Sequence, residues 1–356
     1  MTTAHATSWD HPEVAALRAA QQAELRALYG DDDVGHEMTG DGVLATVLLR
    51  DGDLPVACGV LRAAPELGAG TGELKRMYVV PSHRGRHLAR RVLDELERVA
   101  PQHGLSRLVL ETGALQAAAI GLYLSVGYVP IDRFPPYEDV TTSRCLEKHL
   151  SAREHGSTDR ARQAGLPGST RRDVLDEART DGVAGLVVDR LAWLDDEAVA
   201  LRRLMAQTLR DFYGPVGYFA NDETLAAADL AEAGRSLVVL VVREGTRPLG
   251  TLSLSAAPDG RPADWGELER LLVLPAARGR GVARLLLAAA EDEARGRGLS
   301  TVCLSTGYRQ LPAMRLYLSS GYRIVAPVGE AWPEQGRLFW FAKALQPLRR
   351  PGPRRG

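Results

Sequence analysis

The chain carries the same pattern of residues twice, 194 positions apart. Residues 74–128 align without a gap on residues 268–322, so that Arg84 matches Arg278 and Tyr123 matches Tyr317. Solenoid repeats have periods of about 20–50 residues, so a repeat this long predicts two copies of a whole domain. Residues that both copies keep then mark shared chemistry, and residues that differ mark where the two copies diverge.

Composition favours a chain of two globular domains. With 356 residues, 45% hydrophobic and 25% charged, the chain has ordinary globular character. A net charge of −1 supplies no basic field for nucleic acid, and we expect no such partner. No apolar run approaches the roughly 20 residues that span a bilayer, and the first residues lack a signal-peptide core, so we expect a cytoplasmic protein with no membrane partner.

Two residue types add smaller constraints. Cys58, Cys145 and Cys303 are odd in number and scattered, which favours buried, reduced thiols over a disulfide frame or a metal site. Lysine occurs only at positions 75, 148 and 343, so arginine carries almost all the basic charge. That bias is typical of a GC-rich bacterial genome.

Periodicity predicts an α/β fold around a mixed sheet in each copy. In copy one we expect helices at 13–28, from 88 to about 103 and at 117–126, with strands at 43–49, 55–61, 73–80, 107–111, 128–131 and 143–150. Copy two adds an opening strand at 186–191, helices at 195–213 and 222–233, and strands at 236–243 and 249–255. Copy one has only HATSWD before its first helix, so we expect its opening strand to be short or frayed.

Domain boundaries follow from these patterns. We expect an N-terminal domain at 1–150, a polar linker at 151–183, a C-terminal domain at 184–347 and a disordered basic tail at 348–356.

Each copy has a short loop between a strand and a helix that is suited to bind phosphate. The loops read Arg84-Gly85-Arg86-His87-Leu88-Ala89 and Arg278-Gly279-Arg280-Gly281-Val282-Ala283. A helix N-terminus presents unpaired N–H groups and partial positive charge, and small residues let an anion approach the backbone. A glycine before a helix is also a common plain turn, and neither loop has the pattern of an ATP or dinucleotide site.

These loops, with a second motif, resemble the GNAT superfamily of N-acetyltransferases. The superfamily pattern R/Q-x-x-G-x-G/A is matched fully in copy two by Arg278, Gly281 and Ala283, whereas copy one has His87 in place of a glycine. The second motif is A-x-x-LY-x-x-x-GY, preceded by an amide side chain. It corresponds to Gln116 and Tyr123 in copy one and to Gln310 and Tyr317 in copy two.

The resemblance implies an acetyl-CoA site in each copy, with pyrophosphate on the loop amides and the pantetheine arm along the preceding strand as an added strand. In copy one the implied cofactor-binding residues are Met77, Tyr78, Val79, Arg84, Gly85, Arg86, His87, Leu88, Ala89 and Gln116. In copy two they are Leu271, Leu272, Val273, Arg278, Gly279, Arg280, Gly281, Val282, Ala283 and Gln310.

The resemblance also nominates catalytic residues. Tyr123 and Tyr317 lie where the superfamily's general acid lies, and a phenol can protonate a departing thiolate. The alternative is a structural tyrosine on a buried helix face. Glu73 and Glu267, each eleven residues before the loop arginine, are the candidate bases, although such an acid is equally consistent with an exposed strand residue.

Acetyl-CoA-dependent transfer to a primary amine of a small molecule is the function expected from this resemblance. Substrate determinants are expected in the unmatched parts, among them the acidic residues Asp31, Asp32, Asp33 and Glu37 and the tryptophans Trp265, Trp332 and Trp340. In the alternative, one domain, the N-terminal one first, is a non-catalytic module that binds CoA or another ligand. A monomer and a homodimer are both open.

Overall fold

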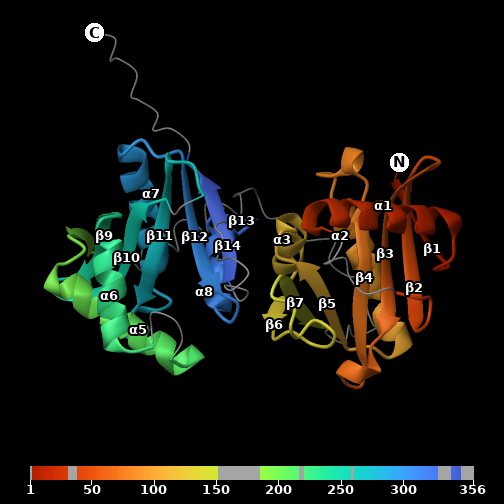
Figure 1. Cartoon of the computed structure of the whole chain (residues 1–356), viewed down its shortest axis with the longest axis horizontal. Helices are drawn as coiled ribbons and strands as arrows, with labels where there is room; N and C mark the ends of the chain where they lie inside the picture. The colour runs from red at the N-terminus through yellow and green to blue at the C-terminus, as the bar shows by residue number, and fades with distance from the viewer. Residues whose placement is uncertain are drawn as a thin grey trace, which may run out of the picture. The chain divides into compact units, whose positions relative to one another are not determined.

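Each half of the chain forms a seven-stranded mixed sheet with helices packed on it (Figure 1). The computed structural model describes residues 2–30, 38–150, 185–215, 220–257, 260–327 and 338–345. The chain divides into two compact units, with the described residues up to 150 in the first and those from 185 in the second. The predicted α/β mixed-sheet fold, present twice, is confirmed. The predicted linker 151–183 and tail 348–356 lie outside the described residues.

The N-terminal domain has the strand order β1-β2-β3-β4-β5-β7-β6. Its elements are β1 (Thr2–Thr7), α1 (Pro12–Tyr29), β2 (Val43–Asp51), β3 (Leu54–Ala63), β4 (Thr71–Val79), α2 (Leu88–Val99), β5 (Arg107–Gly113), α3 (Ala117–Ser125), β6 (Val129–Ile131) and β7 (Ser143–His149).

The C-terminal domain has the equivalent order, β13-β14-β12-β11-β10-β9-β8. Its elements are β8 (Leu186–Leu191), α5 (Asp196–Tyr213), α6 (Asp222–Glu232), β9 (Ser236–Glu244), β10 (Arg247–Ala256), β11 (Trp265–Val273), α7 (Val282–Gly296), β12 (Thr301–Gly307), α8 (Leu311–Ser319), β13 (Arg323–Val325) and β14 (Leu338–Ala344). Among the helices of both domains that the structure describes, none is long and apolar enough to cross a bilayer.

The prediction of a frayed opening strand in copy one is wrong. β1 has six residues, as many as β8, and all six pair with β2 from Thr2 opposite Asp51 to Thr7 opposite Thr46. Its side chains are small and mostly exposed, so it has no apolar pattern. The strand forms because β2 offers a free edge of backbone groups to pair with.

The repeat extends further toward the N-terminus than the sequence alignment suggests. Trp9 matches Trp193 and Tyr29 matches Tyr213, now with a shift of 184. The contacts of the two tryptophans match as well. The Arg18 guanidinium lies 3.3 Å from the centre of the Trp9 ring, and the Arg202 guanidinium lies 4.0 Å from the centre of the Trp193 ring. The change of shift reflects extra residues, including α6, between α5 and β9.

Amphipathic spacing places α2 on the sheet. Leu88, Val92 and Leu96 recur at helical intervals and are almost fully buried against Leu74 of β4 and Leu108 of β5. In α7 the matching residues Val282, Leu286 and Ala290 are buried in the same way. Burying leucines of this size stabilises each domain by roughly 1.5–3 kcal/mol per side chain.

The two central parallel strands separate in both domains. β4 and β5 pair from Thr71–Arg107 to Leu74–Leu110, although β4 continues to Val79. β11 and β12 pair from Trp265–Thr301 to Glu267–Cys303. A β-bulge follows in each copy, at Arg76 (φ 54°) and at the matching Arg270 (φ 59°). A bulge bends its strand, so β4 and β5, and likewise β11 and β12, move apart next to the strand-to-helix loop. We call the unpaired side of β4 or β11 the opened strand edge.

Candidate active site

The two strand-to-helix loops have the same backbone conformation. Gly85 and Gly279 have φ of 77° and 78°, and the residues that begin the helices, His87 and Gly281, have φ of 58° and 81°. Neither helix start receives a side-chain cap, so the N–H groups of its first turn lack an intrahelical partner. A Cβ at Gly85 or Gly279 would meet nothing within 4 Å, so there is open space beside both loops.

His87 therefore preserves the geometry that a glycine provides in the C-terminal loop. Histidine is one of the few non-glycine residues found in the left-handed region at moderate cost. The N-terminal loop therefore has a left-handed residue before its helix, as its counterpart does.

The loop arginines are held by neighbouring groups. Arg84 donates through Nε to the Val79 carbonyl (3.1 Å) and pairs with Glu24 of α1 (2.6 Å). Arg278 donates to the matching Val273 carbonyl at 3.4 Å. Arg86 and Arg280 pair with acids at the ends of β2 and β9, Asp51 at 2.9 Å and Glu244 at 2.6 Å.

Main-chain groups face the opening at alternate residues of β4. The Val80 N–H donates to Val56 of β3, so the backbone of Val79 and of Met77 faces the other way, toward the opening, while that of Tyr78 faces β3. The Met77 carbonyl accepts from Gln21 Nε2 of α1 at 2.9 Å. In the C-terminal domain Leu274 donates to Leu249 of β10, so Leu271 and Val273 face the opening and Leu272 does not.

A cavity of about 990 Å³ lies in the N-terminal domain between the opened strands, α1 and α3. Among the predicted residues that line it are Met77, Tyr78, Val79, Arg84, Gly85, His87, Leu88, Ala89, Gln116 and Tyr123. Lys75, Arg76 and Glu111, which were not predicted as site residues, also line it. Neither Arg86 nor Glu73 is among the lining residues.

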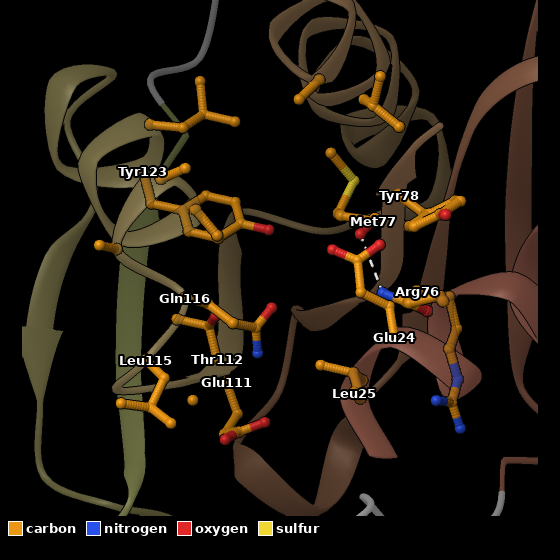
Figure 2. A pocket seen from close by; sticks show the side chains of 18 of the residues that line it. Glu24, Leu25, Arg76, Met77, Tyr78, Glu111, Thr112, Leu115, Gln116 and Tyr123 are labelled. Atoms are coloured by element: carbon orange, nitrogen blue, oxygen red, sulfur yellow. Dashed lines mark hydrogen bonds between the residues drawn. The ribbon is translucent and has the colours of Figure 1, made fainter. Parts of the chain in front are cut away.

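Tyr123 projects into this cavity from α3. Its hydroxyl points across the opening toward the strand that carries Met77, with Glu111 on the neighbouring strand end (Figure 2). Burial, and secondarily the charge of Glu111, raises the pKa of the Tyr123 hydroxyl. Tyr317 occupies the matching position on α8 and is 6% exposed, and burial raises its pKa too. Both phenols stay protonated at neutral pH, as proton donors must.

Glu73 is an ion-paired residue of the sheet. It is 1% exposed, and its carboxylate is contacted by Arg62 (2.6 Å) and Lys75 (3.0 Å). Both ion pairs are already made inside the sheet, and Glu73 does not line the cavity. The geometry therefore does not support Glu73 as the base that the sequence analysis nominated.

Glu267 differs from Glu73 although the two positions match. Position 269 holds a glutamate where the N-terminal domain has Lys75, so Glu267 has an acid two residues along the same strand. Burial, followed by the charge of Glu269, raises the pKa of Glu267 to about 7, against the lowering effect of Arg235 at 2.7 Å. Burial also raises the pKa of Glu269. Glu267 thus titrates near neutral pH.

Tyr29 at the end of α1 is a site residue that the sequence analysis missed. Its hydroxyl accepts from the Leu115 N–H at 2.9 Å, and a Cβ on Gly113 would lie 2.1 Å from that oxygen. Tyr213 and Gly307 repeat the relation at 2.2 Å. The 184-residue shift that pairs Tyr29 with Tyr213 was the available signal.

For the other predicted site residues the structure gives only their positions. Gln116 and Gln310 are the residues before α3 and α8, with φ of −84° and −85°. Trp265 and Trp340 both lie near the Arg261 guanidinium, 5.2 and 5.8 Å from their ring centres. The acidic residues at 31–33 and 37, and Trp332, lie outside the described residues. Among the described residues, no three His, Cys, Asp or Glu side chains gather as a metal site requires.

Comparison with known proteins identifies the family. The model of the Acetyltransferase (GNAT) family matches residues 9–128 and 199–322, one region in each domain. An IAA acetyltransferase of Azospirillum brasilense is 42% identical over 95 residues, 27% of this chain and 61% of that protein. An aminoalkylphosphonate N-acetyltransferase of Salmonella typhimurium is 40% identical over 85 residues, 24% of this chain and 54% of that protein. This chain thus spans less than two thirds of either relative.

The chain is also similar to a solved structure. A Klebsiella pneumoniae protein proposed to be an acyl-CoA N-acyltransferase is 34% identical, with 42% of this chain and 98% of that chain covered and a TM-score of 0.37. The family model covers more than half of the chain and falls on the loop and tyrosine motifs of both domains. The chain therefore belongs to the GNAT acetyltransferase family, with two tandem domains of that family.

Proposed function

We propose that the protein is an acetyl-CoA-dependent N-acetyltransferase that moves an acetyl group directly to a primary amine of a small molecule. The observation that carries the proposal is a doubled arrangement. Each domain has an anion-accepting helix start, an opened strand edge and a buried tyrosine at matching positions. The family membership supports the same reaction class, and two relatives are named for acetyl transfer.

The residues present fit acetyl-CoA. The free amides at the starts of α2 and α7 suit a diphosphate, because they offer several donors and partial positive charge at one point. The outward backbone of Met77 and Val79, or of Leu271 and Val273, suits an extended arm that bears amides. When bound, acetyl-CoA supplies an activated thioester.

Direct transfer is supported by the state of the cysteines. Cys58, Cys145 and Cys303 are all buried, and burial raises the pKa of each thiol to about 12. A thiol with that pKa is almost entirely protonated at neutral pH and is a poor nucleophile. None of the three is suited to carry the acetyl group between donor and acceptor.

Tyr123 and Tyr317 are the proposed proton donors. Each phenol is protonated at neutral pH and therefore has a proton to donate to the departing thiolate. An N–H of the opened strand that faces the cavity is suited to stabilise negative charge on the acetyl oxygen.

The two domains differ in the carboxylate that is suited to accept the amine proton. In the N-terminal domain the cavity carboxylate is Glu111, which accepts a hydrogen bond from Ser143 at 2.6 Å. Position 305 in the C-terminal domain is a serine, so we assign the role there to Glu267, acting by way of water. A carboxyl group that titrates near 7 is well matched to that task.

The alternative, a non-catalytic N-terminal module, is favoured by one observation. Glu73, the residue that matches the proposed base Glu267, is ion-paired with Arg62 and Lys75 and does not line the cavity. The alternative differs from the main proposal in one outcome, which is turnover in the N-terminal domain.

A combined binding and turnover experiment tests the proposal. Calorimetric titration of the full chain with acetyl-CoA should give two sites, and a panel of small primary amines should release CoA and yield acetylated amine by mass spectrometry. Binding at two sites without acetylation of any amine would refute the enzyme. Turnover that survives Tyr123→Phe in full but is lost in Tyr317→Phe would support the N-terminal module.

A further inference from the structure

The two domains carry opposite charges at one matched position of the opened strand. Lys75 of β4 corresponds to Glu269 of β11. The position lies just before the bulge residue, and in the N-terminal domain it lines the cavity. A change of two charge units on this wall alters which acceptor the site stabilises.

In the N-terminal domain the matched position holds a cation. Glu73 is shared by Arg62 and Lys75, at 2.6 and 3.0 Å, and Arg62 also pairs with Glu66 at 2.8 Å. Lys75 contacts the Tyr137 hydroxyl as well, and Arg76 lines the cavity next to it. On the facing strand Glu111 supplies a carboxylate. The cavity thus has the Lys75 ammonium group on one strand and the Glu111 carboxylate on the other.

Lys75 is the lysine that occurs in one domain and not in the other. Of the three lysines, Lys148 in the N-terminal domain pairs with Glu97 at 2.6 Å. In the C-terminal domain the matching lysine, Lys343, pairs with the matching glutamate, Glu291, at 2.7 Å. These two form a structural pair that is common to both domains. Lys75 has no such counterpart, so its charge distinguishes one domain from the other.

In the C-terminal domain the matched position holds a carboxylate, Glu269, within a cluster of acidic and arginine side chains. Arg235 pairs with Glu232 at 2.6 Å and with Glu267 at 2.7 Å, and Glu269 adds a third carboxylate to the cluster. Arg270 and Arg261 lie near enough to interact with Glu269 and Glu267, respectively.

One serine on the neighbouring strand supports a polar ligand at this place. Ser253 and Ser255 of β10 stand opposite Glu269 and Glu267 in the register, and both are at most 1% exposed. Ser255 lies close enough to Glu269 to bond with its carboxylate, whereas the Ser253 hydroxyl has no hydrogen-bond partner among the described residues. A buried hydroxyl group usually has a partner, so the Ser253 hydroxyl is suited to one that arrives with the ligand.

We infer that the residue at position 75 or 269 selects the charge of the acceptor. The N-terminal domain accepts an amine that also carries an anionic group such as a carboxylate, with the anion on Lys75 and the reacting amine toward Glu111. The C-terminal domain accepts an amine that carries a second ammonium group, held by Glu269. This inference rests on the acetyl transfer proposed above and assigns a different substrate class to each domain.

Three amines of similar length test the inference: 4-aminobutanoate, 1,4-diaminobutane and butylamine. With the full chain we expect Lys75→Glu to raise the KM for 4-aminobutanoate about tenfold or more and to leave the diamine unaffected. Glu269→Lys should do the reverse, raising the KM for the diamine relative to butylamine. Each substitution copies the residue found in the other domain, and Lys75→Arg and Glu269→Asp, which retain the charge, are the controls.

The variants must be shown to fold, so each is checked for two acetyl-CoA sites by calorimetry, and Lys75→Met and Glu269→Gln provide milder changes of the same sign. KM values that stay within twofold in all of these variants would overturn the charge assignment alone. If the unmodified chain binds acetyl-CoA but acetylates none of the three amines or any wider panel, acetyl transfer itself is refuted.

Discussion

The two domains agree closely where the acyl donor is proposed to bind and differ where the acceptor is. The loops before α2 and α7 keep the same backbone angles although one has His87 and the other Gly281. The opened strands, in contrast, carry Lys75 in one domain and Glu269 in the other. Binding by main-chain groups constrains conformation and tolerates some change of side chain. Recognition by charge depends on side chains, and these have diverged.

The largest effect is expected from removing both proposed proton donors. The double variant Tyr123→Phe/Tyr317→Phe should lose at least about 100-fold in kcat, because a positioned general acid contributes roughly 10²–10⁴-fold. Calorimetry should show acetyl-CoA affinity unchanged. Tyr322→Phe, which removes a buried hydroxyl that donates to Glu291 on α7, is the control. A fully active double variant would remove the tyrosines from the mechanism.

A second prediction tests whether α1 and α5 are fixed in the same way. Gly113→Ala and Gly307→Ala each place a Cβ about as close to a tyrosine hydroxyl, at 2.1 and 2.2 Å. Each should lower the free energy of unfolding of its domain by roughly 1–3 kcal/mol, measured by denaturant titration. Gly296→Ala, whose Cβ would meet nothing within 4 Å, should not destabilise. Unequal effects at 113 and 307 would show that the helix contacts are not equivalent.

Charge at the helix starts gives the next effect. Gly281→Glu and His87→Glu should each weaken acetyl-CoA binding about tenfold at the altered domain, because a carboxylate repels a diphosphate there. Gly281→Gln and His87→Gln have the same size without the charge and serve as controls. Calorimetry that finds Glu and Gln variants with equal affinity would contradict the loop assignment.

A difference in pH dependence should separate the domains. In the Tyr123→Phe chain, which reports mainly the C-terminal domain, the rate should rise as pH increases through about 7, because Glu267 must lose its proton to act as a base. Glu267→Gln should lower the rate and remove this rise. In the Tyr317→Phe chain the rate should not show the rise near pH 7 that depends on Glu267. An identical rise in both chains would show that the titrating group is not Glu267.

The smallest effect concerns the one residue by which the loops depart from each other. Gly281→His copies the N-terminal loop and should retain acetyl-CoA binding while lowering stability by about 1 kcal/mol, the lower end of the cost of a side chain in the left-handed region. Parallel thermal unfolding and calorimetry check it. A loss of binding would mean that His87 weakens the N-terminal site after all.

Most strands, helices and loops could be predicted from the sequence because each depends on residues that lie close together along the chain. The spacing of Leu88, Val92 and Leu96 reports a helix by itself. β1 was underestimated because its pairing partner, β2, lies some forty residues away. Glu73 was nominated as a base because its position in the sequence resembles that of a base in related enzymes. Only the structure shows that its carboxylate forms ion pairs with Arg62 and Lys75.

The sequence by itself determined that two GNAT domains lie in tandem and which tyrosines are matched, and it predicted which loops are suited to an anion. These properties depend on residue type and spacing along the chain. Tertiary structure decided which carboxylates face a cavity, which are held by arginines, and that Lys75 lies on the wall of the cavity. Those properties depend on distance and burial between residues far apart in sequence, and such distances are set only when the sheet and α1 have packed.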